Sequence, residues 1–137
     1  MTKVDLGYFQ AHYDEELDAI VETWVTSPTS EEFRTGMNKI IDMMAHYKTG
    51  ALLGDTKELG ALSEEDQQWS FTDWLAKALE VGYHSFAVII SPDIFAQMSV
   101  EDTLTEVQAK TTVTIQYFDD EEKAREWILS TRKEASA

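Results

Sequence analysis

The sequence lacks several residue types and patterns, and each absence excludes a class of function. It contains no cysteine, which excludes disulfides, thiolate metal sites and a cysteine nucleophile. Basic residues are scarce: 11 lysines and arginines stand against 26 aspartates and glutamates, a net charge of -15. Because such a surface repels phosphate groups, we expect neither nucleic-acid binding nor attraction to an anionic membrane. No apolar run approaches the roughly 20 residues that span a bilayer and no signal-peptide core is evident, so we expect a cytoplasmic protein.

The residues that are present predict one α/β domain. A chain of 137 residues with 43% hydrophobic content can bury a full core, so we expect a single domain over residues 1–137 with a frayed tail at about 131–137. Two segments near the N-terminus, Leu6–Tyr13 and Leu17–Val25, are rich in aromatic and β-branched residues and predict an antiparallel hairpin. In the second segment, alternation places Ile20, Glu22 and Trp24 on one face of the strand.

Alternating strand and helix signals follow the hairpin. Thr29 and Glu32 have capping-box spacing, with Ser30 as an alternative cap, before a helix that runs to about Lys48. A short strand, a polar loop and a second helix come next, and the chain then continues with two more strands and two more helices. The predicted segments are the strand Ala51–Leu53, the loop Gly54–Ala61, the helix Ser63–Val81, the strand Ser85–Ile90, a helix that starts at Ser91-Pro92 and breaks near Ser99, the strand Val113–Phe118 and a final helix after Asp119.

The resulting order, β-β-α-β-α-β-α-β-α, predicts a five-stranded mixed sheet with packed helices. The nearly continuous apolar run Ser85–Ile90 is typical of a central strand that is parallel to its neighbour. In the second helix, helical spacing places five residues on one face that suits burial, and Trp74 lies off that face. The five residues are Trp69, Thr72, Leu75, Ala76 and Leu79.

Motifs for catalysis or cofactor binding are not evident in the sequence. The three histidines, His12, His46 and His84, stand in no metal-ligand pattern. No GxGxxG, Walker or GxSxG motif occurs, and no nucleophile–base pair is visible. We therefore predict no catalytic residue, no metal and no cofactor.

The best candidates for a binding site lie where strands end and helices begin, because ligands collect at such edges of α/β sheets. Asp55 and Thr56 follow the central strand, and Ser63 is the predicted cap of the next helix. Aromatic residues beyond strand ends, Phe71, Trp74 and Phe95, are the candidates for an apolar patch or cleft.

Several segments together resemble the bacterial SpoIIAA-like domains of the STAS/SEC14 type. The resemblance is carried by Trp24…Pro28…Glu32-Phe33-Arg34, Leu52-Leu53-Gly54-Asp55, Asp66…Trp69…Trp74 and Tyr117-Phe118-Asp119-Asp120…Ala124…Trp127-Ile128. STAS domains are regulatory binding modules, and some are switched by phosphorylation in an Asp-Ser-Ser/Thr-Gly-like motif at a helix N-terminus. SEC14-like domains enclose apolar ligands, often lipids.

The resemblance implies candidate phosphosites by position alone, because the Asp-Ser-Ser-Gly run is missing here. Ser63 is the nearest match and Thr56 the next. A phosphate on Ser63 would meet the positive end of a helix but also the carboxylates of residues 64–66, so a capping role for Ser63 outweighs a phosphosite.

We expect a non-enzymatic binding module that recognises a protein partner or a small apolar ligand near the loop after the central strand. The alternative is a SEC14-like carrier of a lipid or other apolar molecule, and a hydrolase ranks third. A homodimer through the exposed hairpin edge is a further possibility that the sequence leaves open.

Overall fold

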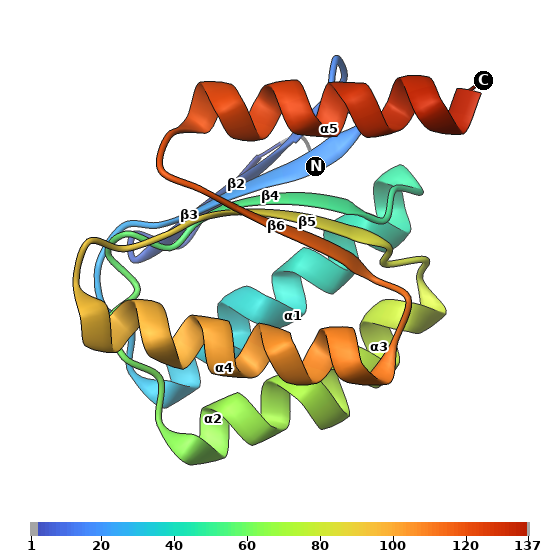
Figure 1. Ribbon diagram of the computed structural model, residues 1–137. Helices are drawn as coiled ribbons and strands as arrows, with labels where there is room; N and C mark the ends of the chain where they lie inside the picture. The colour runs from blue at the N-terminus through green and yellow to red at the C-terminus, as the bar shows by residue number, and fades with distance from the viewer. Residues whose placement is uncertain (1–2, 137) are drawn as a thin grey trace.

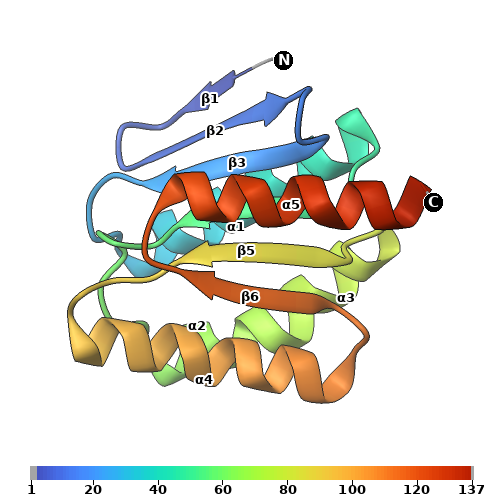
Figure 2. The ribbon, with the colours of Figure 1, turned by 45° about the horizontal axis from the view of Figure 1, so that its top comes forward.

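Six strands form one mixed sheet in the computed structural model, which describes residues 3–136, with side chains up to Arg132. The strands lie side by side in chain order (Figure 2). The second strand is antiparallel to the first and to the third, and the last four run parallel. The strands are β1 Lys3–Asp5, β2 Phe9–Asp14, β3 Ala19–Trp24, β4 Ala51–Asp55, β5 Ser85–Ile89 and β6 Thr114–Phe118.

The mixed α/β sheet confirms the predicted fold class, and the strand count is the difference: there are six strands rather than five. The additional strand, β1, pairs with β2 from Lys3 opposite His12 to Asp5 opposite Gln10. A three-residue strand is too short to show the alternation on which the prediction depended. Gly7 makes its turn possible, with a φ of 86° and a backbone N–H that donates to Asp5 at 2.9 Å.

Helices cover both faces of the sheet, as Figure 1 shows. Helix α5 lies alone on one face, and all the other helices lie on the opposite face. Their bounds are α1 Ser30–Tyr47, α2 Glu64–Trp69, η1 Ser70–Trp74, α3 Leu75–Glu80, α4 Ile94–Lys110 and α5 Glu121–Ser136. Whether the last turn of α5 frays stays a prediction, and Ala137 lies outside the described residues.

The sheet is buried on both faces, so its middle strands carry apolar residues at successive positions. On the α5 side, Ala124 and Ile128 pack on Val21, Leu53 and Ala87. The other face holds the larger core, in which the Trp24 ring contacts Phe9 in a tilted arrangement and stacks on Phe33, with centroid distances of 4.7 and 5.5 Å.

The caps set where α1 and α4 begin. Thr29 caps α1 in a complete capping box with Glu32, as predicted. The predicted start of α4 at Ser91-Pro92 is wrong, because Asp93 accepts hydrogen bonds from the backbone N–H groups of Phe95 and Ala96 and α4 begins at Ile94. The predicted break near Ser99 is also wrong: α4 is continuous to Lys110.

The predicted second helix is three helical segments in a row, α2, η1 and α3, of which η1 is a π-helical turn. A π turn holds one more residue than an α turn, so it rotates everything that follows around the helix axis. The predicted buried face is therefore wrong in part: Thr72, Ala76 and Leu79 are exposed. Leu75 is buried as predicted, and the other residues that turn inward are Asp66, Ser70, Trp74 and Ala78.

Candidate functional site

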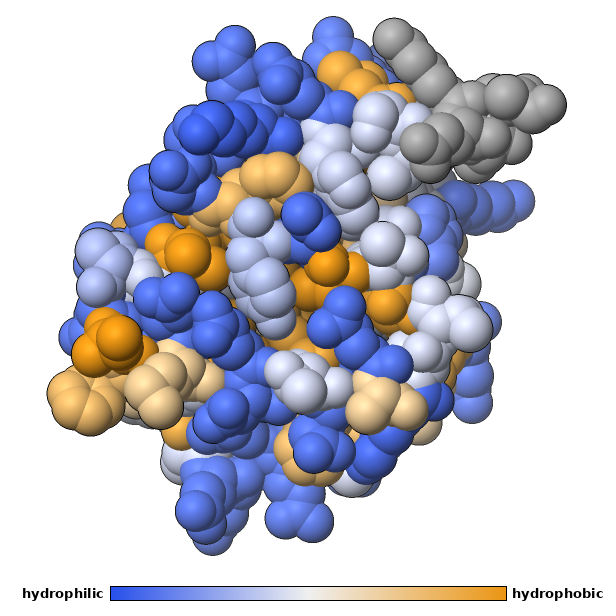
Figure 3. Space-filling model, viewed as in Figure 1, coloured by the Kyte–Doolittle hydropathy of each residue, from blue (hydrophilic) through white to orange (hydrophobic). Residues whose placement is uncertain are grey.

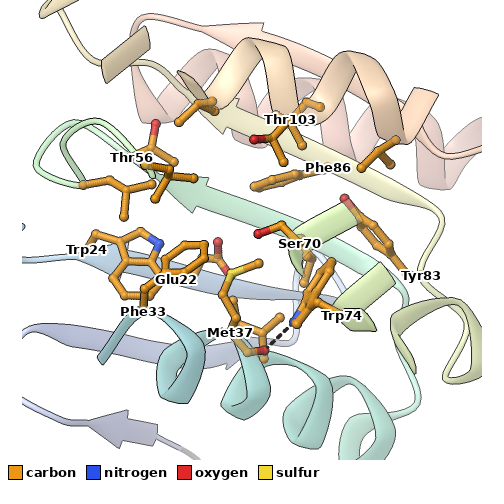
Figure 4. A pocket seen from close by; sticks show the side chains of 17 residues that line it. Glu22, Trp24, Phe33, Met37, Thr56, Ser70, Trp74, Tyr83, Phe86 and Thr103 are labelled. Atoms are coloured by element: carbon orange, nitrogen blue, oxygen red, sulfur yellow. Dashed lines mark hydrogen bonds between the residues drawn. The ribbon is translucent and has the colours of Figure 1, made fainter. Parts of the chain in front are cut away.

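A cavity of about 60 Å³ lies between the sheet and the helices that cover its larger core. Its floor comes from β3, β4 and β5, and its walls come from α1, η1 and α4 and from the loop after β4 (Figure 4). Five of the lining residues are aromatic: Trp24, Phe33, Trp74, Tyr83 and Phe86. Most of the others are aliphatic, so the cavity is an apolar space inside the core.

Glu22 is the one carboxylic acid among the residues that line the cavity, and none of the others is basic. Its side chain rises from the middle of β3 and points in among Phe33, Met37 and Ser70 (Figure 4). Glu22 is only 2% exposed, and its Oε2 atom has no hydrogen-bond partner in the part of the chain that is described, with side chains up to Arg132. Burial raises the pKa of Glu22 from 4.5 to about 8, because a low-dielectric environment disfavours the charged form.

Gly54 makes room for this carboxyl group. Glu22 and Gly54 are register partners on the parallel strands β3 and β4. A Cβ atom at position 54 would stand 2.7 Å from Glu22 Oε1 and 2.8 Å from the ring of Phe86. Since real Cβ atoms do not approach other heavy atoms so closely, any side chain at position 54 would displace the carboxyl group or the ring.

The remaining polar groups at the cavity are hydroxyls. Thr56, Ser70 and Thr103 each donate to a backbone carbonyl, at 2.7, 2.7 and 3.0 Å. Tyr83 is buried beside them, and its pKa is raised by burial and then by the charge of Glu22. Hydroxyl oxygens that already donate retain acceptor capacity, so the cavity offers several weak acceptors and one strong one, Glu22.

The π turn places two lining residues. Ser70 and Trp74 are its first and last residues, and both face the cavity. The indole Nε1 of Trp74 donates to the Met37 carbonyl at 2.7 Å, which ties η1 to α1 across the cavity (Figure 4). Single π turns inside helices are frequent at functional sites because they reposition side chains.

Two of the residues proposed from the sequence lie at this cavity. Trp74 is 4% exposed and forms part of the wall, although the helical spacing had placed it off the buried face. Thr56 is buried at the start of the loop after β4, where its hydroxyl donates to Ile89. Leu59 and Leu62 of the same loop also line the cavity.

The other four proposed residues lie away from the cavity. Asp55 accepts from the backbone N–H of Lys57 at 3.0 Å and pairs with its ammonium group at 3.5 Å. Phe71 is half-buried, with the Lys110 ammonium group 4.6 Å from its ring centroid. Phe95 is 75% exposed on α4. The structure therefore does not bring the six residues together into one site.

The fourth of these, Ser63, is exposed and caps α2 by accepting from the N–H of Asp66 at 3.1 Å. The reciprocal half of a capping box is missing, because the Asp66 carboxylate is buried and accepts from Ser30 at 2.7 Å and Arg34 at 3.0 Å. Ser63 thus has the structural role that the sequence favoured over a phosphosite.

Glu22 was not among the residues proposed from the sequence. Its signal was present in the alternation of the second strand, which placed Glu22 between Ile20 and Trp24 on one face. Those two large apolar side chains are fully buried, and an acid between them on the same face is buried with them. A charged residue flanked by core residues at i−2 and i+2 is the pattern that would have identified it.

Among the described side chains, those of residues 3–132, no cluster of three or more histidines and carboxylates is placed to hold a metal ion. No helix in the same range has both the length and the apolar character needed to cross a membrane.

Comparison with known proteins identifies the family. The family model for SpoIIAA-like domains matches residues 19–129, which is most of the chain, so this protein belongs to the SpoIIAA-like family. Neither the curated proteins nor the solved structures contain a match. Membership supports a STAS-type regulatory or binding module.

Proposed function

We propose that this SpoIIAA-like domain is a non-enzymatic binding module whose ligand is a small, mostly apolar molecule held in the cavity between the sheet and helices α1, η1 and α4. The observation that carries the proposal is the buried, unpartnered Glu22 carboxyl group in an otherwise apolar, aromatic-lined space. Ligand sites commonly combine apolar walls with a few convergent polar groups. The loop after β4 supplies part of the wall, in keeping with the position expected from the sequence.

The size of the cavity argues for a small ligand rather than a lipid. Pockets for drug-sized ligands usually measure about 300–1,000 Å³. The volume here is about 60 Å³, so a lipid chain would enter only after α4 or η1 had moved away from the sheet. The SEC14-like carrier is therefore the weaker alternative.

Methionine methyl NMR tests the proposal, because the chain carries well-separated reporters. Met37 lines the cavity, whereas Met98 is 52% exposed on α4 and serves as the surface control. On titration with short-chain alcohols, we expect the Met37 methyl signal to shift and saturate while the Met98 signal stays in place. Equal, non-saturating shifts at both positions would mean that the cavity takes no ligand.

A protein partner remains a second candidate because α4 exposes apolar side chains near its start. Ile94, Phe95 and Met98 are 63%, 75% and 52% exposed, and Figure 3 shows apolar side chains gathered at that end of the face. Exposed clusters of this kind mark interaction surfaces when they are large enough. Sedimentation of wild type and Phe95→Ser against concentration tests self-association through this surface, and identical monomeric profiles would leave the cavity as the proposed site.

A further inference from the structure

The cavity holds an acid without a counter-ion. Among the described residues that line it, Glu22 is the only carboxylic acid and no lysine, arginine or histidine is present. The atom Oε2 is buried and makes no hydrogen bond to the described part of the chain, whose side chains extend to Arg132. Buried polar atoms in native proteins are nearly always paired, so an unpaired carboxyl oxygen aimed into a cavity indicates a missing hydrogen-bond partner.

The surroundings of Glu22 favour a positively charged donor over a neutral one. Aromatic rings surround the space, including Trp24, Phe33 and Trp74, and aromatic faces attract cations. The net charge of -15 also draws small cations toward the protein and repels anions. An anionic ligand would find no basic residue among those that line the cavity, and the hydroxyls of Thr56, Ser70 and Thr103 already donate to backbone carbonyls.

The charged form of Glu22 is accessible near neutral pH. With a pKa of about 8, about a fifth of the molecules carry an ionised Glu22 at pH 7.4. Tyr83 is the other titratable residue that lines the cavity, and its pKa is raised, so it stays neutral through this range. A cation that binds next to Glu22 would therefore release one proton from most molecules.

The cavity volume limits the size of the cationic group that can bind beside Glu22. The volume of about 60 Å³ is less than half of the roughly 150 Å³ of an engineered cavity that binds benzene. A compact head with a few heavy atoms therefore fits, whereas a quaternary or aromatic cation does not. A primary ammonium group also has three donors, which suit the free Glu22 oxygen and the acceptor lone pair of the neighbouring Ser70 hydroxyl (Figure 4).

We propose, resting on the small-ligand function above, that the cavity binds the ammonium group of a small primary amine, with the Glu22 carboxylate as its counter-ion and the aromatic rings as its wall. No covalent step is involved. Glu22 is the residue that sets specificity, and the apolar walls supply the rest of the affinity.

The test compares three probes of similar size on the full chain: propylamine, 1-propanol and propionate. Binding is followed at the Met37 methyl group with Met98 as the control, in about 0.3 M NaCl so that surface attraction is screened. Three variants accompany wild type. Glu22→Gln removes the counter-ion, Glu126→Gln makes the same substitution on the exposed face of α5, and Val100→Leu adds a methylene group to the cavity wall.

We expect wild type and Glu126→Gln to bind propylamine at least about tenfold more tightly than 1-propanol, and propionate not at all. Glu22→Gln should lose the preference for the amine while still binding the alcohol, and Val100→Leu should weaken both. Because ionised Glu22 is the binding form, amine affinity should also rise by about tenfold or more from pH 6 to pH 8.5, while the affinity for 1-propanol stays nearly constant.

Two results would overturn the inference. If 1-propanol binds wild type as tightly as propylamine at pH 8.5, the cavity takes neutral ligands, and the proposed function stands without the amine. If neither probe shifts the Met37 methyl signal, both proposals fail. Should Glu22→Gln not fold, the probe comparison and its pH dependence in wild type decide the question by themselves.

Discussion

The burial of Glu22 makes the stability of the fold depend on pH in a direction opposite to that of most carboxylates. The unfolded chain ionises this group near 4.5, and the folded chain near 8. Between these values the folded state keeps a proton that the unfolded state has lost. The free energy of unfolding therefore falls as pH rises, and the stabilising effect of the neutral form is lost by the time the pH passes the folded pKa.

The magnitude follows from the two pKa values. Each unit of pKa difference corresponds to about 1.4 kcal/mol, so the slope in this window is close to 1.4 kcal/mol per pH unit. From pH 5.5 to pH 7.5 the contribution of Glu22 to the free energy of unfolding should fall by about 2–3 kcal/mol. Glu22→Gln has nearly the same shape and does not titrate, so it should lack this loss.

Urea unfolding at pH 5.5, 6.5 and 7.5, followed by far-ultraviolet circular dichroism, measures the effect. Other carboxylates also titrate in both proteins, so the informative quantity is the difference between wild type and Glu22→Gln as the pH changes. A buried amide brings its own unsatisfied donors at a cost of about 1–3 kcal/mol, but that cost does not vary with pH. Glu126→Gln makes the same substitution at an exposed position and should follow the wild-type profile.

Parallel stability profiles for wild type and Glu22→Gln, differing by a constant amount at all three pH values, would refute the reasoning. They would mean that Glu22 keeps an ordinary pKa in the folded state, through solvent access or an unseen donor. The cavity would then not be the apolar, water-poor space from which the binding proposals start.

Three further predictions concern the cavity walls and the surface, each measured by urea unfolding at pH 6. Gly54→Ala should cost about 1–3 kcal/mol, because the new Cβ atom meets the Glu22 carboxyl group at 2.7 Å. Trp74→Phe should cost about 1 kcal/mol or more, because the bond from its indole Nε1 to the Met37 carbonyl is lost. Phe95→Ser should leave stability within about 0.5 kcal/mol of wild type because the side chain is exposed. Equal stabilities for Gly54→Ala and wild type would show that the carboxyl group moves freely.

Periodicity and turn signals in the sequence predicted most of the fold. The alternation in Leu17–Val25 and the apolar run Ser85–Ile90 correctly indicated an antiparallel hairpin and a buried parallel strand. The errors lie where local signals are weak or compete. Strand β1 is too short for a pattern, and Asp93 rather than Ser91 caps α4 because its side chain reaches two free N–H groups.

The π turn explains why the second helix was harder to predict than the first. A helical wheel assumes a constant 3.6 residues per turn, and the wider turn at Ser70–Trp74 breaks that assumption. Trp74 consequently faces the core instead of lying off the buried line. No residue type in this stretch signals a π turn, so the sequence alone does not reveal the change.

The candidate site could be predicted only in part. The loop after β4 was chosen because ligands collect at strand ends, and Thr56 does line the cavity. The polar centre of the cavity lies instead in the middle of β3, and its walls come from segments up to 85 residues apart, from Glu22 to Val107. These segments come together only in the folded chain, so local sequence patterns do not show that they share a cavity. Among 26 acidic residues, Glu22 stands out by its place between two core residues on one face of β3 and by a buried oxygen without a partner.

The most direct test is a carbon-13 NMR titration of the Glu22 side-chain carboxyl group, assigned by comparison with Glu22→Gln. In the free protein we expect this signal to titrate with a pKa of about 8. In saturating propylamine the midpoint should move to lower pH, because the bound ammonium group stabilises the carboxylate. A signal that titrates near 4.5 and ignores the amine would contradict both the buried acid and its role in ligand binding.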